Sequence, residues 1–192
     1  TGRIMTYKLA DINSDGIADS RSTPIAGHPI AMAFGKRLWA LASDGTIWRQ
    51  SFFTGLASNV ANFPNAEYHG IALVDTSLLL LAGNANETNL FYFDVDSLNV
   101  VRADTIFLGD YYTLGPVVAD MNLDGLPELV TFTEDGHGLL LTIDTTIYPP
   151  VYTTLSQKNT GFNFTSNPVI SDVDLDGYPD IIIGGSSAVY AF

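Results

Sequence analysis

The feature that most constrains the fold is an internal repeat in the second half of the chain. Residues 115–144, GPVVADMNLDGLPELVTFTEDGHGLLLTID, and residues 167–192, NPVISDVDLDGYPDIIIGGSSAVYAF, superimpose without gaps through their acidic segments. Each contains a proline, two aliphatic residues, an aspartate, a loop and a strand-like run. One unit of strand, acidic loop, strand, turn and strand therefore recurs.

Two upstream segments, 28–52 and 69–94, have the same rhythm of strands but lack the acidic loop, and we interpret them as degenerate copies. Repeats that begin about every 40–50 residues and hold three or four strands are typical of propeller blades. We therefore expect an all-β fold, a β-propeller-type repeat of four or five blades or a fragment of a propeller. The expected single repeat domain comprises an N-terminal partial blade with a calcium loop (1–28), degenerate blades (29–68 and 69–114), a blade with a calcium loop (115–166) and a C-terminal partial blade with a calcium loop (167–192).

Short apolar and β-branched runs, bounded by Gly, Pro, Asn or Asp, carry the all-β prediction. The Asp44-Gly45 and Asp135-Gly136 pairs between such runs predict hairpin turns. Examples of the predicted strands are 29–34, 37–42, 46–52, 77–83, 89–95, 128–133, 138–144 and 180–185.

Three loops share one acidic pattern: DINSDGIAD (11–19), DMNLDGLPE (120–128) and DVDLDGYPD (172–180). Oxygen ligands at alternate positions of a tight loop can converge on Ca²⁺, and glycine at position 6 permits the sharp turn. Side chains at positions 1, 3, 5 and 9 and the carbonyl at position 7 would supply the ligands of three Ca²⁺ sites. These are Asp11, Asn13, Asp15, Ile17 and Asp19; Asp120, Asn122, Asp124, Leu126 and Glu128; and Asp172, Asp174, Asp176, Tyr178 and Asp180.

Other readings of the loops fit less well. An EF-hand needs a bidentate Glu at position 12, where the chain has Ser22, Thr131 and Ile183, and the loops at 120 and 172 lead into strand-forming residues. A cluster of Asx turns that binds nothing is the alternative, but carboxylates held together without a cation repel one another. Mg²⁺ is disfavoured because it prefers octahedral sites that keep several waters.

The segments PVVADMNLDGLPELV and NPVISDVDLDGYPDIIIGG resemble FG-GAP/VCBS repeats, the calcium-loop blades also found in the β-propeller of integrin α subunits. The resemblance implies a propeller in which each calcium loop joins the first two strands of a blade and holds it rigid. It assigns the ligand roles to the same positions of the three loops. It covers residues 115–192 and 7–19, whereas residues 28–94 match only in rhythm.

Composition narrows the range of partners. The formal net charge of −13 argues against nucleic acid and anionic membrane surfaces and suits a protein that binds cations. Cysteine is absent, which excludes disulfides and thiolate sites, and no apolar run reaches the length of a membrane-spanning helix. The chain begins at Thr1 without a charged, apolar leader, so we expect any signal sequence to have been removed or to precede this segment. Sequons at Asn86 and Asn163 are compatible with a secreted glycoprotein.

The sequence contains no nucleophile elbow, phosphate-binding glycine loop or HExxH motif. His28, His69 and His137 each adjoin Gly or Pro, which favours structural roles. Aromatic residues could stack on sugar rings, although packing between blades is their commoner fate; these residues are Trp39, Trp48, Tyr111 and Tyr112.

We therefore expect a non-enzymatic, calcium-binding extracellular domain with a structural, adhesion or recognition role and a protein or carbohydrate ligand on the cell surface or matrix. A polysaccharide-active lyase or hydrolase, or a carbohydrate-binding propeller, is one alternative. Another is a subunit of a calcium-dependent extracellular homopolymer that self-associates through its unfinished terminal blades.

Overall fold

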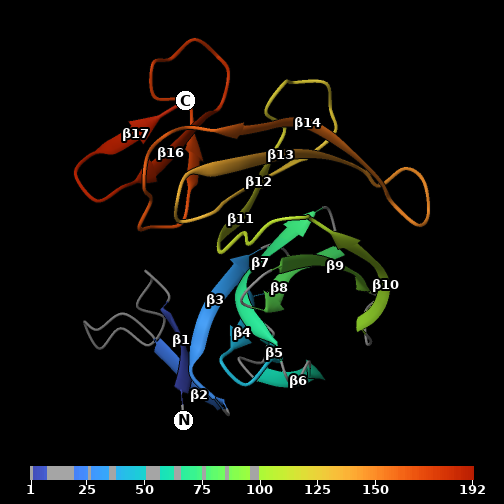
Figure 1. The fold of residues 1–192 in the computed structure, drawn as a ribbon. Coiled ribbons are helices and arrows are strands. Elements are labelled where there is room, and N and C mark those ends of the chain that lie inside the picture. The colour runs from blue at the N-terminus through green and yellow to red at the C-terminus, as the bar shows by residue number, and fades with distance from the viewer. Residues whose placement is uncertain are drawn as a thin grey trace. The chain divides into compact units, whose positions relative to one another are not determined.

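The protein is built from β-strands arranged in consecutive antiparallel sheets, which confirms the all-β prediction (Figure 1). The computed structural model describes residues 2–7, 20–25, 27–34, 38–50, 57–62, 66–74, 77–84, 87–95 and 100–192. All regular elements in these ranges are strands, and none of these residues belongs to a helix that is long and apolar enough to cross a membrane. The chain divides into two compact units, Thr1–Asn65 and Ala66–Phe192.

The first unit contains a two-stranded and a four-stranded sheet. β1 (Gly2–Tyr7) pairs with β2 (Ser20–Ile25). The four-stranded sheet follows chain order with β3 (Pro29–Phe34), β4 (Leu38–Ala42), β5 (Thr46–Gln50) and β6 (Ala57–Asn62). Its buried side chains include Trp39, Leu41 and Ile47.

The second unit contains three further sheets, and each again follows chain order. The first has β7 (Glu67–Val74), β8 (Ser77–Asn84), β9 (Glu87–Val95) and β10 (Val100–Phe107). The second has β11 (Leu114–Ala119), β12 (Glu128–Phe132), β13 (His137–Asp144) and β14 (Val151–Asn159). The third has β15 (Val169–Ser171), β16 (Asp180–Gly184) and β17 (Val189–Ala191).

Tight turns explain why neighbours in sequence are neighbours in each sheet. The Asp44-Gly45 pair joins β4 to β5, and the Asp135-Gly136 pair joins β12 to β13, as the sequence predicts. Gly45 and Gly136 have φ of 80° and 96°, a left-handed region that glycine enters without the steric cost of a Cβ. Asp44 supports its turn by accepting a hydrogen bond from the Thr46 amide at 3.0 Å.

β12 shows how the sheets of the second unit pack. Its five residues, ELVTF, are all buried, and alternate side chains of a strand point to opposite faces. Leu129 belongs to a core that includes Leu79, Leu81 and Tyr92 of the preceding sheet. Val130 and Phe132 belong to a second core with Ile183 of the following sheet. The continuous apolar character of β12 therefore reflects burial on both faces.

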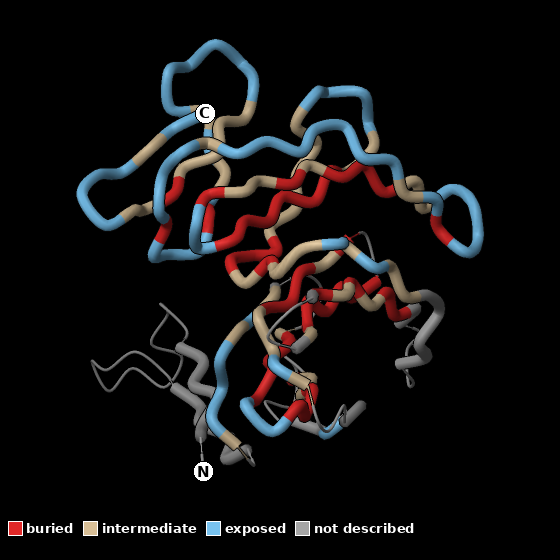
Figure 2. The backbone as a smooth tube through the Cα atoms, in the orientation of Figure 1, coloured by how far each residue is buried: buried red, intermediate tan, exposed pale blue. Residues whose placement is uncertain are grey.

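The strands of the middle sheet differ in burial according to their position (Figure 2). β12 is buried throughout, whereas β14, the last strand of the same sheet, is exposed at almost every residue. At the other edge of the sheet, β11 contacts both β7 and β15, the first strands of the neighbouring sheets. The first strand of the middle sheet therefore contacts the first strands of both neighbouring sheets, and the fourth strand of the middle sheet faces solvent.

Candidate metal sites in the acidic loops

The loop 120–128 connects β11 to β12, and the pairing of Ala119 with Glu128 closes it at its base. Its acidic side chains fold inward onto the backbone of the loop. Asp120 accepts hydrogen bonds from the amides of Asp124 at 3.1 Å and Gly125 at 2.9 Å. Asn122 Oδ1 accepts from the Asp124 amide at 3.0 Å, and Asp124 Oδ1 accepts from the Leu126 amide at 2.8 Å. Positions 1, 3 and 5 therefore gather on one side of the loop.

The loop 172–180 stands in the same place between β15 and β16, with Ser171 paired to Asp180 at its base. Asp172 Oδ2 accepts a hydrogen bond from the Gly177 amide at 3.0 Å. Asp174 Oδ1 accepts from the Asp176 amide at 3.2 Å, and Asp176 Oδ1 accepts from the Tyr178 amide at 2.8 Å.

The two loops have one backbone conformation. In both, position 4 is a leucine in the left-handed region, with φ of 60° at Leu123 and 62° at Leu175. Position 6 is a glycine with φ of 88° at Gly125 and 93° at Gly177. A left-handed residue other than Gly, Asn or Asp costs about 1–2 kcal/mol. Both copies of the repeat hold a leucine in this strained conformation, so the conformation is part of the repeated loop pattern.

Position 9 anchors each loop to its own base. Glu128 Oε2 accepts a hydrogen bond from the Met121 amide at 2.7 Å, and Asp180 Oδ2 accepts from the Val173 amide at 2.8 Å. Glu128 is fully buried, and its Oε1 also accepts a hydrogen bond from Thr142 Oγ1 at 3.1 Å. Sequence reasoning did not single out Thr142, because it lies 14 residues away on β13 and carries no local signal.

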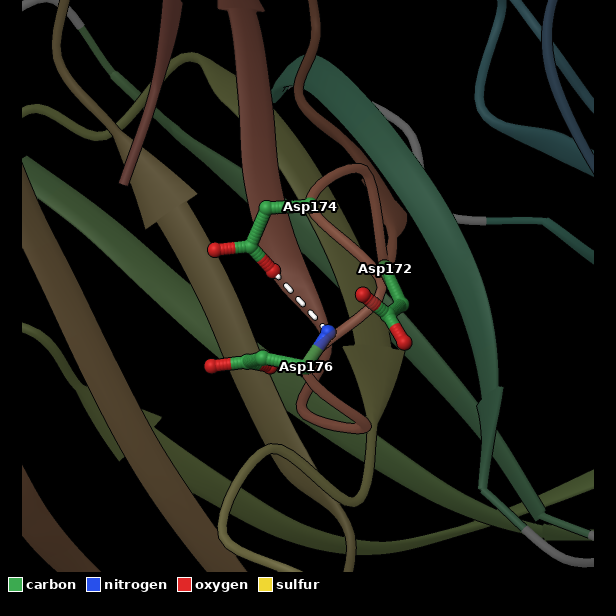
Figure 3. A group of neighbouring side chains, drawn as sticks. All are labelled: Asp172, Asp174 and Asp176. Carbon is green, nitrogen blue, oxygen red and sulfur yellow. Dashed lines mark hydrogen bonds between the residues drawn. The ribbon is translucent and has the colours of Figure 1, made fainter.

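The donor set at the second loop fits a cation. One carboxylate oxygen from each of Asp172, Asp174 and Asp176 lies within 4.8 Å of the other two (Figure 3). Asp172 Oδ1 is buried and has no hydrogen-bond partner among the described residues. A buried, unpaired carboxylate oxygen is costly, and a hard cation is the partner that carboxylates at this spacing can share. The first loop offers the amide oxygen of Asn122 where the second has a carboxylate.

The structure places the predicted ligands unevenly. In the loop at 172 it brings Asp172, Asp174 and Asp176 together, whereas Asp180 and the acids of the loop at 120 (Asp120, Asp124 and Glu128) join no such group among the described residues. Leu126 and Tyr178 occupy position 7 of the two loops. The predicted ligands Asp11, Asn13, Asp15, Ile17 and Asp19 lie outside the described residues.

Other residues that the sequence singled out have separate environments. Tyr112 is fully buried in the core shared by the first two sheets of the second unit, and Trp39 is buried in the first unit. The Trp48 Nε1 atom is buried without a hydrogen-bond partner among the described residues. His28 is exposed, whereas burial lowers the pKa of His69 and the nearby Glu67 opposes that shift.

Comparisons with known proteins identify the fold only. No family model matches the chain, and no curated protein matches it. Among solved structures, the chain is similar to the computationally designed Ika4 protein, with 14% identity and a TM-score of 0.56 over 88% of this chain and 95% of that one. It is also similar to the PQQ-bound aldose sugar dehydrogenase from Streptomyces coelicolor, with 13% identity and a TM-score of 0.51 over 94% of this chain. The chain spans 60% of the length of that dehydrogenase.

Proposed function

We propose that the chain is a calcium-binding repeat domain of the FG-GAP/VCBS type in which Ca²⁺ stiffens successive blades. The observation that carries the proposal is the shared conformation of the loops at 120 and 172, together with the buried, unpartnered Asp172 Oδ1 atom. Side chains at positions 1, 3, 5 and 9 and the position-7 carbonyl would hold the ion in each loop. The loop at 11–19 is the third proposed site.

Electrostatics supports a cation in these loops. Unit charges about 4 Å apart repel by about 1 kcal/mol in bulk water and by about 4 kcal/mol at an effective dielectric constant of 20. The three carboxylates of the second loop lie in this range of distances. Backbone amides offset part of that repulsion, and a divalent cation reverses its sign. Ca²⁺ suits a flexible loop with many oxygen ligands better than Mg²⁺ does.

We propose a β-propeller arrangement of four or five blades for the chain. The support is the contact of β11 with the first strands of both neighbouring sheets, together with cores formed between successive sheet faces in the second unit. Blades around a common axis have this pattern. In the second unit, each acidic loop would then connect the first two strands of its blade.

The biological role we propose is non-enzymatic: extracellular recognition or adhesion, with a protein or carbohydrate ligand at a cell surface or matrix. The formal net charge of −13 suits a domain that binds cations. Extracellular calcium modules bind the ion with dissociation constants of about 10⁻⁴–10⁻³ M, so the proposed calcium loops suit a secreted domain.

Metal analysis and thermal unfolding, each with Ca²⁺ and with chelator, test the calcium proposal. Saturation of one site at a free concentration of 100 times the dissociation constant stabilises the folded state by about 2.7 kcal/mol. We expect Asp124→Ala and Asp176→Ala each to lose one bound ion and to lower Tm more in Ca²⁺ than in chelator, where only hydrogen bonds within the loop, such as that from the Leu126 or Tyr178 amide, are lost. A chain that binds no Ca²⁺ and melts at the same temperature in chelator would refute the proposal.

A further inference from the structure

A cavity with acidic residues in its lining lies at the end of the middle sheet opposite the acidic loop of that sheet. The acidic loop follows Ala119 at the end of β11, whereas the cavity surrounds the other end of that strand, near the pairing of Leu114 with Phe132. Its volume is about 250 Å³, and its lining comes from the segment before β11 and the turn between β12 and β13. The lining residues are Asp110, Tyr111, Thr113, Thr133, Glu134 and Asp135.

The charge in this cavity is one-sided. Asp110, Glu134 and Asp135 line it, and the described part of its lining contains no lysine or arginine. A fourth carboxylate, Glu67, accepts the hydrogen bond of the Tyr111 hydroxyl beside them. That bond, burial and the negative charges of Glu67 and Glu134 raise the pKa of Tyr111 to about 12, so the hydroxyl remains a hydrogen-bond donor to Glu67. A concave surface with one sign of charge focuses its field and concentrates ions of the opposite sign.

Two of the acids are positioned by neighbouring groups, and one is not. Asp135 Oδ1 accepts a hydrogen bond from Thr133 Oγ1, which lowers the pKa of the Asp135 carboxyl, and it lies 3.3 Å from His137 Nδ1. Asp110 Oδ1 accepts from the Tyr111 amide at 2.8 Å. Among the described residues, the structure records no hydrogen bond or ion pair to the carboxylate of the exposed Glu134. Its charge is therefore available to a ligand.

An unsatisfied hydroxyl provides an observation that does not depend on the acidic charge. Thr113 lines the cavity, and its Oγ1 atom is buried with no hydrogen-bond partner among the described residues. Native proteins rarely leave a buried hydroxyl without a partner unless a water or ligand supplies one. A ligand with several N–H donors could satisfy this oxygen and the carboxylates together.

The geometry favours an organic cation over a metal ion. In the part of the chain that the structure describes, only Asp172, Asp174 and Asp176 bring three metal-ligating atoms within 4.8 Å of one another. His137 Nδ1 lies 3.8 Å from Asp110 and 3.3 Å from Asp135, yet the three do not form such a group. Spread carboxylates beside an aromatic ring suit a larger cation, which can combine charged hydrogen bonds with a cation–π contact.

We propose that this cavity binds the guanidinium or ammonium group of an arginine or lysine side chain. Glu134 and Asp110 would accept N–H hydrogen bonds, Thr113 would accept a further one, and the Tyr111 ring would contact the cation. The site is separate from the acidic loops, so it extends the proposed function from calcium binding to the recognition of a basic partner.

Calorimetric titration of the intact chain in Ca²⁺ with N-acetyl-argininamide and N-acetyl-lysinamide tests this proposal, with the Tyr111 ring resonances followed by NMR. We expect saturable binding of both cations and changes at the Tyr111 ring. Neither is expected with N-acetyl-citrullinamide, the uncharged analogue of the arginine probe. Glu134→Gln and Asp110→Asn should each weaken binding about tenfold, since a hydrogen bond between charged groups contributes about 1.5–3 kcal/mol.

The matched control is Asp144→Asn, which removes one negative charge at the opposite end of β13 and should leave the affinity unchanged. Calcium stoichiometry is measured on every variant, and the cavity variants should retain all of their ions. Equal binding of the citrulline probe, equal weakening by Asp144→Asn, unchanged affinity in Glu134→Gln, or no saturable binding would each overturn the proposal. None of these results would bear on calcium binding by the loops.

Discussion

Asp172 Oδ1 is buried, and no described protein group donates a hydrogen bond to it. Its other oxygen accepts the Gly177 amide, so the side chain is fixed with one oxygen satisfied and one not. With Asp174 and Asp176 nearby, the isolated loop stores repulsion that a bound cation would release. The charge of this one residue should therefore affect stability in opposite directions with and without the ion.

Asp172→Asn tests that inversion. The amide oxygen can still accept the Gly177 N–H, while one of three clustered charges disappears. In chelator we expect Tm to rise by about 2–4 °C, the shift that about 1 kcal/mol produces in a chain of this size. In saturating Ca²⁺ we expect Tm to fall below that of the unmodified chain. Asp144→Asn is the control, and an effect of the same sign in both conditions would contradict the prediction.

His69 is the second residue whose charge affects stability. Its Nε2 atom is buried without a described partner, and its ring meets the Tyr111 ring edge to face at 5.4 Å between centroids. Burial lowers its pKa below the value of about 6.5 that histidine has in unfolded chains. The folded state then binds fewer protons than the unfolded chain, so the contribution of His69 is complete above pH 6.5 and declines as the pH falls.

His69→Phe should therefore flatten the dependence of stability on pH. Urea unfolding at pH 7.5 and pH 5.5 should show a smaller loss of unfolding free energy in the variant than in the unmodified chain. The phenylalanine ring can keep the aromatic contact with Tyr111. His28→Phe, a change at an exposed residue, should leave the pH dependence as it is. Parallel pH profiles for His69→Phe and the unmodified chain would rule out this role for His69.

At the scale of the elements, β7 and β11 approach each other closely at Gly70. A Cβ atom at that position would lie 2.1 Å from the Gly115 carbonyl oxygen and 2.8 Å from Pro116 Cδ. The first atom belongs to the backbone and the second to the proline ring, so neither can move aside as the end of a flexible side chain could. Gly70 therefore sets how near the first strands of two sheets can come.

Gly70→Ala should destabilise the chain by about 1–3 kcal/mol or more, the cost of inserting extra atoms into a packed interior. Gly161→Ala is the matched control, because Gly161 has positive φ but open space around its Cα, and only the conformational cost of about 1–2 kcal/mol applies. Chemical denaturation of both variants measures the difference. A smaller loss in Gly70→Ala than in Gly161→Ala would show that the strands separate freely.

The local sequence pattern predicted many of the strands correctly, because short apolar runs mark the strands and Asp-Gly pairs mark turns between them. The strand 29–34 is found as β3 with the predicted bounds, and the Asp-Gly pairs mark the turns between β4 and β5 and between β12 and β13. Strands with weaker signals were missed: β14, VYTTLSQKN, is mostly polar because it is exposed, so no apolar run marks it.

The functional residues could be predicted from the sequence only where they lie close to one another along the chain. Spacing within nine residues indicated the inward-facing acids at 120 and 172. The partnership of Glu128 with Thr142 and the grouping of Asp110 with Glu134 and Asp135 depend on strand pairing between distant segments, which no local spacing encodes. The turn sequence TEDGHG signalled a hairpin, but not that its acids would face a cavity.

At the scale of the whole molecule, the dominant property is a formal net charge of −13. Self-repulsion on this scale destabilises the compact state, and salt screens it over a Debye length of about 10 Å at 0.1 M. Bound calcium ions would neutralise part of the same charge at the loops. Salt and calcium should therefore act on a common term in the stability of the chain.

Added NaCl should raise the Tm of the chelated chain by a few degrees and that of the calcium-loaded chain by less. Differential scanning calorimetry across a range of NaCl concentrations, in chelator and in saturating Ca²⁺, measures both slopes. Equal slopes would show that the loops do not contribute to the charge that salt screens.

Each described acidic loop closes on its own sheet. In the loop at 172, the described hydrogen bonds of the acidic side chains lie within nine residues, and in the loop at 120 one further partner comes from the next strand but one, β13. Such a loop should be transferable to other proteins. Grafted between an unrelated pair of antiparallel strands of the same register, it should keep its conformation, and the number of bound ions should then equal the number of loops inserted.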